Sequence, residues 1–231
     1  MFNVMKRFVI GDIHGHAESL EQCLERSGFD INNDILICLG DAGDRGPNTK
    51  ETFDMLLQIK SLLYIKGNHD TWLLDWALGD YDIMEGVWKY NGGNRTIKNY
   101  DSDPDNIPEA HIELLKNAPL YHLTDDNKLF VHGGIEPDKK LEEHKEDILL
   151  WDREFVFDVF YKSQKGIKVP LRYDEIYVGH TPTTSIPFNS DVPLSLYGVW
   201  MMDTGVGMGN KLSIMDIETK EVWQSDKIKQ K

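Results

Sequence analysis

Residues 7–15 read RFVIGDIHG, a short strand-like run that stops at a glycine and is followed by an aspartate and a histidine. Four later stretches repeat this arrangement: ILICLGDAGDRG (35–46), LLYIKGNHD (62–70), LFVHGG (129–134) and EIYVGHT (175–181). One such junction is only a turn after a strand. Five of them place carboxylate, amide and imidazole groups at strand ends, and this mixture of oxygen and nitrogen donors is typical of a pair of divalent metal ions.

The first three junctions are evenly spaced along the chain. Asp12, Asp41 and Asn68 are 29 and 27 residues apart, which is about the length of one strand–helix–strand unit. Helix-period sequence fills both intervals, over 17–27 and from Asn48 onward. Parallel strands joined by right-handed crossovers end at the same edge of a sheet, so we expect these three side chains to lie together in space.

The rest of the chain predicts a second sheet and a helical insertion within a single domain, 1–231. Residues 71–120 contain tryptophans among Asp-, Gly- and Asn-rich turns, and we interpret them as a helical cap insertion whose tryptophans form its own core. Short strands are expected later, at 120–123, 128–131, 175–178, 198–203 and 211–217. Gly205, Gly207 and Gly209 predict a tight turn between the last two of these. The expected fold class is α/β.

Composition narrows the class of protein. With 231 residues, 40% of them hydrophobic, the chain can bury a full core as one domain. The formal net charge of −14 argues against binding to nucleic acid or to an anionic membrane, although a local metal pair and a few arginines can still attract an anionic substrate. Cys23 and Cys38 are expected to be reduced core residues. Because the sequence shows neither a signal peptide nor an apolar run of about 20 residues, we expect a cytoplasmic enzyme.

The polar residues at the strand ends match the needs of phosphate-ester hydrolysis. This reaction needs a strong nucleophile, neutralised phosphate oxygens and a proton for the leaving group. Two divalent cations about 3.5–4 Å apart meet the first two needs, and one carboxylate has to bridge them. The expected ligands are Asp12 and His14 for the first metal, Asp41 as the bridge, and Asn68, His132 and His180 for the second.

The remaining polar groups can bind the phosphate and protonate the leaving group. His69 directly follows a metal ligand, so its side chain more naturally faces the substrate than the same metal. Imidazole titrates near neutral pH and suits a general acid, a role worth about 10²–10⁴ in rate. Asp44 is the carboxylate expected to hold the other ring nitrogen. Arg45 and Arg153 can supply the two-pronged contact that phosphate favours, although an arginine after a tryptophan is sometimes an ordinary surface residue.

Taken together, GDIHG (11–15), GDAGDRG (40–46), GNHD (67–70), VHGG (131–134) and VGHT (178–181) resemble the phosphoprotein phosphatase branch of the calcineurin-like metallophosphoesterases. Within it, the chain is similar to small prokaryotic serine/threonine phosphatases, such as that of bacteriophage lambda, and to bacterial diadenosine tetraphosphatases. The resemblance runs from Asp12 to about Gly209. It implies a four-layer α/β/β/α sandwich, a pair of divalent ions (Mn first, Fe/Zn as alternatives) and direct attack by a metal-bridging hydroxide. It also supports the roles given to Arg45 and Arg153.

Three positions bear on the subclass. Lys66 stands where the family's fourth motif has an arginine, so a phosphate contact from this position is doubtful. Asp70 replaces a glutamate that is one methylene longer, which leaves its partner open. The last motif carries the single histidine His180, and this disfavours the nucleotidases and cyclic-nucleotide phosphodiesterases.

The expected function is therefore a serine/threonine protein phosphatase that acts on phosphoproteins. The alternative is asymmetric hydrolysis of dinucleoside polyphosphates such as diadenosine tetraphosphate, which would use the same metal centre on a small nucleotide. An inactive scaffold that binds phosphorylated partners is disfavoured, because neither a metal ligand nor the general acid is missing.

Overall fold

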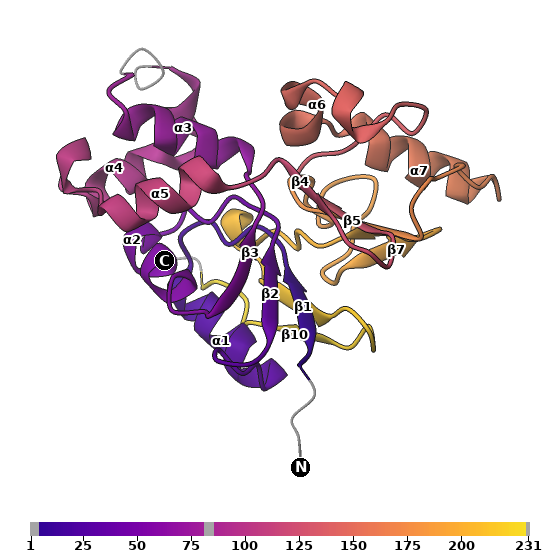
Figure 1. The fold of residues 1–231 in the computed structure, drawn as a ribbon, viewed down its shortest axis with the longest axis horizontal. Coiled ribbons are helices and arrows are strands. Elements are labelled where there is room, and N and C mark those ends of the chain that lie inside the picture. Colours follow the sequence, from indigo (N-terminus) through magenta and orange to yellow (C-terminus); the bar gives the residue numbers. More distant parts are fainter. Residues whose placement is uncertain (1–4, 81–85, 230–231) are drawn as a thin grey trace.

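A computed structural model describes residues 5–80 and 86–229, and two five-stranded sheets form its centre (Figure 1). The first sheet has the strand order β10–β9–β1–β2–β3, and the second has the order β4–β5–β6–β8–β7. The strands are β1 (Arg7–Ile10), β2 (Ile35–Cys38), β3 (Ser61–Tyr64), β4 (Tyr121–Leu123), β5 (Lys128–Val131), β6 (Glu175–Val178), β7 (Leu194–Leu196), β8 (Val199–Met201), β9 (Ser213–Asp216) and β10 (Val222–Gln224).

Helices cover the outer faces of both sheets. The longer ones are α1 (Ala17–Ser27), α2 (Thr49–Leu56), α3 (Asn68–Ala77), α4 (Asn94–Asn99), α5 (Glu109–Asn117), α6 (Glu146–Trp151) and α7 (Glu154–Gln164). Short helical turns are η1 (Lys89–Gly93), η2 (Pro104–Asn106), η3 (Leu141–Glu143) and η4 (Val206–Met208). The α/β class is confirmed.

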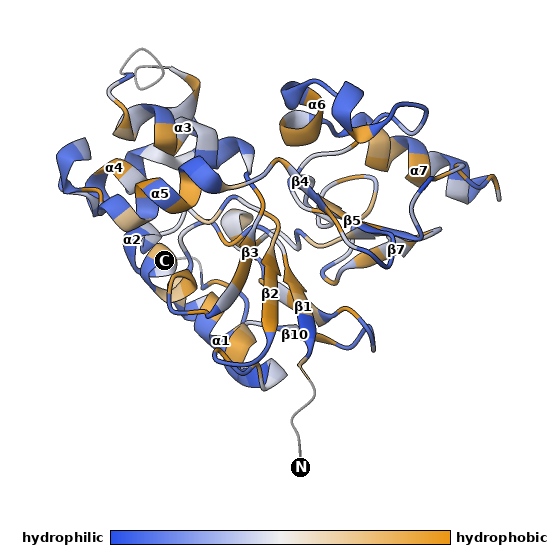
Figure 2. Ribbon diagram, viewed as in Figure 1, coloured by the Kyte–Doolittle hydropathy of each residue, from blue (hydrophilic) through white to orange (hydrophobic). Residues whose placement is uncertain are grey.

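The side chains of β1 point alternately to its two faces, and this shows how the two sheets pack against each other with helices on the outside. Phe8 and Ile10 belong to the apolar cluster under α1 and α2, whereas Val9 between them belongs to a cluster shared with the second sheet. From the second sheet, Phe130 and Tyr177 enter this shared cluster, with their rings stacked 4.7 Å apart. A separate cluster lies between the second sheet and α7. The order is therefore helices, sheet, sheet, helices, and the apolar colour of β2 in Figure 2 reflects burial on both faces.

The region predicted as a helical insertion contains α4, α5 and most of α3, and its residues 81–85 lie outside the described part of the chain. Trp76, Trp88 and Tyr100 from this region are buried, and they belong to the same apolar cluster as Phe53 of α2. The tryptophans at 76 and 88 are thus core residues, as expected. Because they share a core with the first sheet's helices, the region extends that helical layer.

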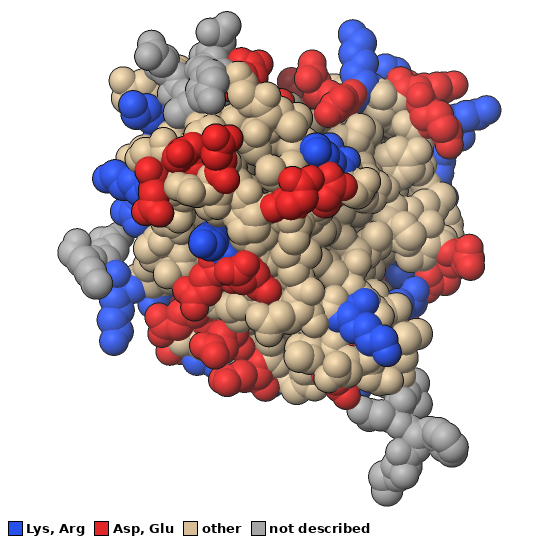
Figure 3. All heavy atoms as spheres, turned by 60° about the vertical axis from the view of Figure 1, so that its left-hand side comes forward, with Lys and Arg blue, Asp and Glu red and all other residues tan. Residues whose placement is uncertain are grey.

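Acidic residues outnumber basic ones in this chain, with 39 Asp and Glu against 25 Lys and Arg. Figure 3 shows Asp and Glu side chains gathered in several clusters over the face that includes α2, α4 and α5, with Lys and Arg more scattered. Within the described residues, no helix combines the length and the apolar character needed to span a bilayer. An anionic substrate therefore has to be attracted by local positive charge and not by the surface as a whole.

Candidate metal and catalytic centre

Loops at the carboxyl ends of β1, β2 and β3 bring Asp12, Asp41 and Asn68 to one edge of the first sheet. The three strands are parallel and in register, so their ends are level. The backbone N–H of His14 donates to the carbonyl of Asp41 (2.9 Å), and the backbone N–H of His69 donates to Oδ1 of Asp41 (2.9 Å). These bonds tie the first loop to the second and the second to the third.

The second sheet delivers two histidines to the same place. His132 follows β5 and His180 follows β6, which is the parallel neighbour of β5. Nε2 of His132 lies 3.0 Å from Oδ1 of Asn68 and 3.4 Å from Oδ2 of Asp41. The backbone N–H of His180 donates to both carboxylate oxygens of Asp12 (3.0 and 3.2 Å). Strand ends from both sheets therefore converge on one buried centre.

Backbone carbonyls fix the three imidazoles that we predicted as ligands. Nδ1 of His14 bonds to the carbonyl of Gly43 (3.0 Å), and Nδ1 of His132 bonds to that of Leu39 (2.7 Å). In His180 it is Nε2 that bonds to the carbonyl of Trp151 (3.2 Å). A ring nitrogen that donates to a carbonyl leaves the other nitrogen unprotonated in the neutral ring, which is the form that binds a metal ion.

The backbone of the centre is strained. Five of its non-glycine residues have φ between 50° and 70°, a region that ordinary residues rarely adopt: His14, Asp41, Asp44, Arg45 and His180. Such conformations cost of order 1–3 kcal/mol each and persist where the surrounding structure enforces them, typically at functional sites. These backbone conformations direct the side chains into the centre.

The two predicted carboxylate ligands have opposite electrostatic surroundings. Burial raises the pKa of Asp12 well above its usual range, and the nearby charges of Asp203 and Asp41 act in the same direction. Burial would also raise the pKa of Asp41, but the facing imidazoles of His132 and His69 hold it well below its usual range. Asp41 is thus the carboxylate that stays ionised most readily.

The imidazoles also differ from one another. Burial lowers the pKa of His14 far below its usual value, and Arg45 and His69 lower it further. Burial together with the charges of His132 and Arg153 lowers the pKa of His180 to about 2. Burial would lower the pKa of His132 as well, but Asp41 raises it to about 10. Two of the three rings are therefore held neutral.

The donor set fits a pair of divalent cations. Ligand atoms lie within 4.8 Å of one another in two groups, His14–Asp41–His69 and Asp41–His132–His180, and Asp41 is common to both. Oδ2 of Asp12 also lies 3.9 Å from Nε2 of His14. Divalent ions accept such mixtures of carboxylate oxygen and imidazole nitrogen, and their charge would offset the repulsion among the buried carboxylates.

His69 is set apart from the other histidines by its partners. Its Nδ1 lies 2.6 Å from Oδ2 of Asp44, and because a carboxylate only accepts, Nδ1 is the donor. Its Nε2 lies 3.1 Å from Nη2 of Arg45, and because a guanidinium only donates, Nε2 is the acceptor. Both ring nitrogens therefore already have partners within the protein, although a ring nitrogen of His69 also belongs to the first of the two groups of ligand atoms. This is the Asp–His pairing expected from the sequence.

Asp70, whose partner the sequence left open, joins the loops that follow β2 and β3. Its Oδ2 accepts from the backbone N–H groups of Gly67 (2.8 Å) and Asp41 (2.9 Å), and the hydroxyl of Tyr64 donates to Oδ1 (2.9 Å). Burial, together with the charge of Asp41, raises its pKa to about 7. The shorter side chain therefore holds the second and third loops together.

Asp203 is a buried residue of the centre that the sequence reasoning missed. It follows β8, and its Oδ1 accepts from the backbone N–H of Gly205 (2.9 Å) at the start of the turn around η4. Its charge raises the pKa of Asp12. The sequence did contain a pattern that could have predicted it, because VWMMDTG (199–205) is a sixth apolar run that ends at an aspartate.

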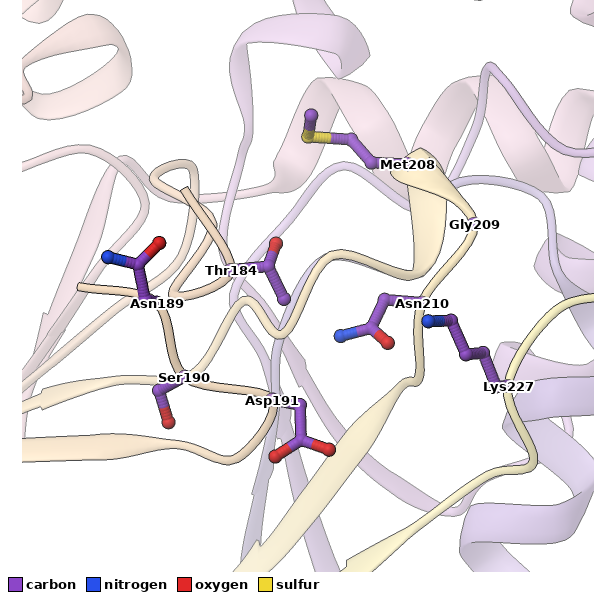
Figure 4. A pocket seen from close by; sticks show the side chains of 8 residues that line it. All are labelled: Thr184, Asn189, Ser190, Asp191, Met208, Gly209, Asn210 and Lys227. Carbon is purple, nitrogen blue, oxygen red and sulfur yellow. The ribbon is translucent and has the colours of Figure 1, made fainter. Parts of the chain in front are cut away.

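The predicted tight turn between the last strands is confirmed, with Gly205 and Gly209 at positive φ around η4. On one side of it, a side chain at Gly207 would collide with the ring of His14 and approach Arg45. On the other side, Met208, Gly209 and Asn210 line an open, mostly polar hollow (Figure 4). The hollow and the centre are therefore neighbours across this turn. The other residues that line the hollow are Thr184, Asn189, Ser190, Asp191 and Lys227.

Arg153 is an exposed residue whose charge interacts with residues of the centre. It lies at the start of α7, and its charge acts on the buried ring of His180. Next to it, Trp151 is 39% exposed and makes an edge-to-face contact with Trp72 (5.0 Å between ring centroids). Trp72 in turn contacts the ring of His69 (4.9 Å). Positive charge and indole rings thus lie beside the centre.

Comparison with known proteins identifies the family. A model of the calcineurin-like phosphoesterase family matches residues 5–200. A curated relative, the bis(5'-nucleosyl)-tetraphosphatase PrpE [asymmetrical] of Oceanobacillus iheyensis, is 31% identical over 240 residues, covering 94% of this chain and 90% of the relative.

Solved structures agree on the fold. A candidate diadenosine tetraphosphatase superposes with a TM-score of 0.67 at 18% identity, covering 97% of this chain and 95% of that one. A protein serine/threonine phosphatase from Saccharomyces cerevisiae superposes with a TM-score of 0.61 at 15% identity, covering 98% and 81%. At such identities the likeness concerns the fold alone.

The residues matched by the family model include all five strand-end motifs and the buried centre that they form. The match spans most of the chain, and the curated relative is similar over nearly its whole length. The chain therefore belongs to the calcineurin-like phosphoesterase family and is a metal-dependent phosphoesterase.

Proposed function

We propose that this phosphoesterase hydrolyses dinucleoside tetraphosphates asymmetrically. One observation carries the proposal: the relative of that activity is 31% identical and is matched over 90% of its length. The protein phosphatase reading, which the sequence favoured, rests on structures at 15% identity, and these support the fold but not the substrate. The alternative reading is therefore the better supported of the two.

The proposed ligands are those predicted from the sequence. Asp12, His14 and Asp41 would hold one divalent ion, and Asp41, Asn68, His132 and His180 would hold the other; Mn²⁺ is our first choice, with Fe and Zn as alternatives. When bound, such a pair activates water and neutralises phosphate oxygens. The short distances between His132, Asn68 and Asp41 support the second set, and the contact between Asp12 and His14 supports the first.

In this mechanism His69 gives a proton to the leaving oxygen, and Asp44 orients its ring. Nε2, the atom that would carry this proton, accepts a hydrogen bond from Arg45. Arg45 therefore has to turn away before Nε2 can be protonated. A phosphate group offers the guanidinium a charged, two-pronged partner, so substrate binding itself frees the general acid.

The aromatic border of the centre supports a nucleotide substrate. Indole faces stack on nucleobases, a contact worth about 1–3 kcal/mol per base. Trp151 is exposed, unlike the buried Trp76 and Trp88; it contacts Trp72 and lies two residues before Arg153 in the chain. A base on Trp151 would lie beside the arginine that we propose for the phosphate chain.

The direct test is turnover of diadenosine tetraphosphate and of a phosphothreonine peptide by the Mn²⁺-loaded protein. We expect a higher kcat/KM for the dinucleotide, with ATP and AMP formed in equal amounts, and complete loss of activity with a chelator. A preference for the peptide would return the function to protein dephosphorylation. Formation of ADP alone would show symmetric cleavage and contradict the proposal.

A second test uses Trp151→Ala. We expect this change to lower kcat/KM for diadenosine tetraphosphate about 10-fold, because about 1.4 kcal/mol of stacking is lost, and to leave turnover of 4-nitrophenyl phosphate nearly unchanged. Tyr161→Ala is the matched control, since Tyr161 is an exposed aromatic residue on α7. Equal losses on both substrates would show that Trp151 only supports the centre.

A further inference from the structure

Two side chains of the segment 88–96 hold the carboxylate of Asp44, although they lie 44 and 52 residues further along the chain. The indole Nε1 of Trp88 donates to Oδ2 (2.6 Å), and the hydroxyl of Thr96 donates to Oδ1 (2.6 Å). The backbone N–H of Asp44 donates back to the Thr96 oxygen (3.0 Å). All three residues are completely buried. Both carboxylate oxygens are therefore fixed by donors from this one segment.

The same segment also contacts the next residue, Arg45. The backbone N–H of Arg45 donates to the carbonyl of Gly92 (3.3 Å), and Nε donates to that of Asn91 (3.5 Å). Gly92 has φ of 111°, and a side chain there would collide with the Arg45 backbone. The chain can thus approach Arg45 this closely only with a glycine at 92.

Trp88 is itself locked in place. Its ring packs against Trp76 (5.8 Å between centroids), and a side chain at Gly93 would collide with the indole. With the ring fixed, its N–H has one direction, toward Oδ2 of Asp44. Oδ2 is also the atom that accepts from Nδ1 of His69 (2.6 Å).

We propose that the segment 88–96 is a positioning element for the general acid, with Trp88 and Thr96 as positioning residues. By fixing both oxygens of Asp44, they hold the ring of His69 so that Nε2 faces the leaving oxygen. The inference rests on the proposed role of His69. In the step concerned, the oxygen of water forms a bond to phosphorus and loses a proton to solvent, the bond from phosphorus to the leaving oxygen breaks, and that oxygen takes the proton from Nε2. Nε2 takes up a proton from solvent before the next turnover.

This role has a chemical signature that ordinary structural support lacks. A leaving group of high pKa, such as phenol, needs a proton as it departs, whereas 2,4-dinitrophenol departs readily as an anion. A badly positioned acid therefore slows phenyl phosphate much more than 2,4-dinitrophenyl phosphate. General damage to the metal centre slows both esters alike.

The experiment measures kcat/KM of the Mn²⁺-loaded variants on both esters. Trp88→Phe and Thr96→Val, each of which removes one donor and keeps most of the volume, should lose about 10-fold on phenyl phosphate and less than about 3-fold on 2,4-dinitrophenyl phosphate. Thr96→Ser restores the hydroxyl and should recover most of the loss. Trp76→Phe is the matched control, because Trp76 is a buried neighbour that does not donate to Asp44, and it should affect neither ester selectively.

A second readout does not depend on turnover. In ¹⁵N-histidine NMR spectra, the Nδ1 proton of His69 should be shifted far downfield and exchange slowly in the wild type and in Thr96→Ser. It should broaden or move upfield in Thr96→Val and Trp88→Phe. An unchanged resonance in both variants would contradict the positioning role.

His69→Asn separates failure of this inference from failure of the proposed mechanism. If His69→Asn shows the leaving-group effect and the Trp88 and Thr96 variants do not, the positioning role is wrong and the general acid stands. If His69→Asn slows both esters equally, the general acid itself is wrong. In the His69→Asn background, Trp88→Phe should add no further leaving-group effect, since both act through one proton transfer.

Discussion

Asp41→Asn should reduce kcat by about 10³-fold or more, because it removes the charge from the one carboxylate shared by both metal groups, and metal-derived stabilisation amounts to several kcal/mol. The substitution keeps the shape of the side chain, so the hydrogen bond from the backbone of His69 can persist. The measurements are turnover of 4-nitrophenyl phosphate and bound metal per chain, and both should fall.

Asp34→Asn is the matched control for this prediction. Asp34 is also buried and also accepts from backbone N–H groups, those of Lys6 and Asp30, but it lies before β2, at the opposite end of that strand from Asp41. It should retain full turnover and full metal content. Wild-type turnover in Asp41→Asn would show that Asp41 is not a metal ligand, and the proposed mechanism would then lack its shared ligand.

The strand-end motifs were readable from the sequence because each is local. An apolar run that stops at Gly-Asp or Gly-His needs only a few consecutive residues, and parallel pairing then determines which ends meet. This is why Asp12, Asp41 and Asn68 could be expected at one edge, and why the strands at 7–10, 128–131 and 175–178 were predicted with the bounds that the structure shows. Asp203 obeys the same rule and could have been found.

Other features depend on residues far apart in the chain. β7 and β10 are three-residue edge strands that pair with β8 and β9, and such short runs form strands only because a neighbour is there to pair with. The bonds from Trp88 and Thr96 to Asp44 join residues 44 and 52 positions apart. No local sequence pattern predicts these bonds, since a tryptophan among turns predicts burial but not the partner of its N–H.

His69→Asn should reduce kcat about 10²–10⁴-fold, which is the usual value of a positioned general acid, and leave bound metal unchanged. Metal retention is expected because both ring nitrogens of His69 are engaged by Asp44 and Arg45, and His69 is not one of the proposed ligands. The measurements are kcat on phenyl phosphate and metal content. Compared with Asp41→Asn, which should lose metal and activity together, this variant should lose activity alone.

His111→Asn provides the matched control for the loss of a buried histidine. His111 on α5 is 1% exposed and bonds to Asp54 and Tyr100, in the helical layer and not at the strand ends. Its replacement should lower the unfolding temperature while the folded protein keeps its kcat. Loss of metal in His69→Asn would instead make His69 a ligand, as its distance to His14 and Asp41 allows, and the proton for the leaving group would then have to come from another donor.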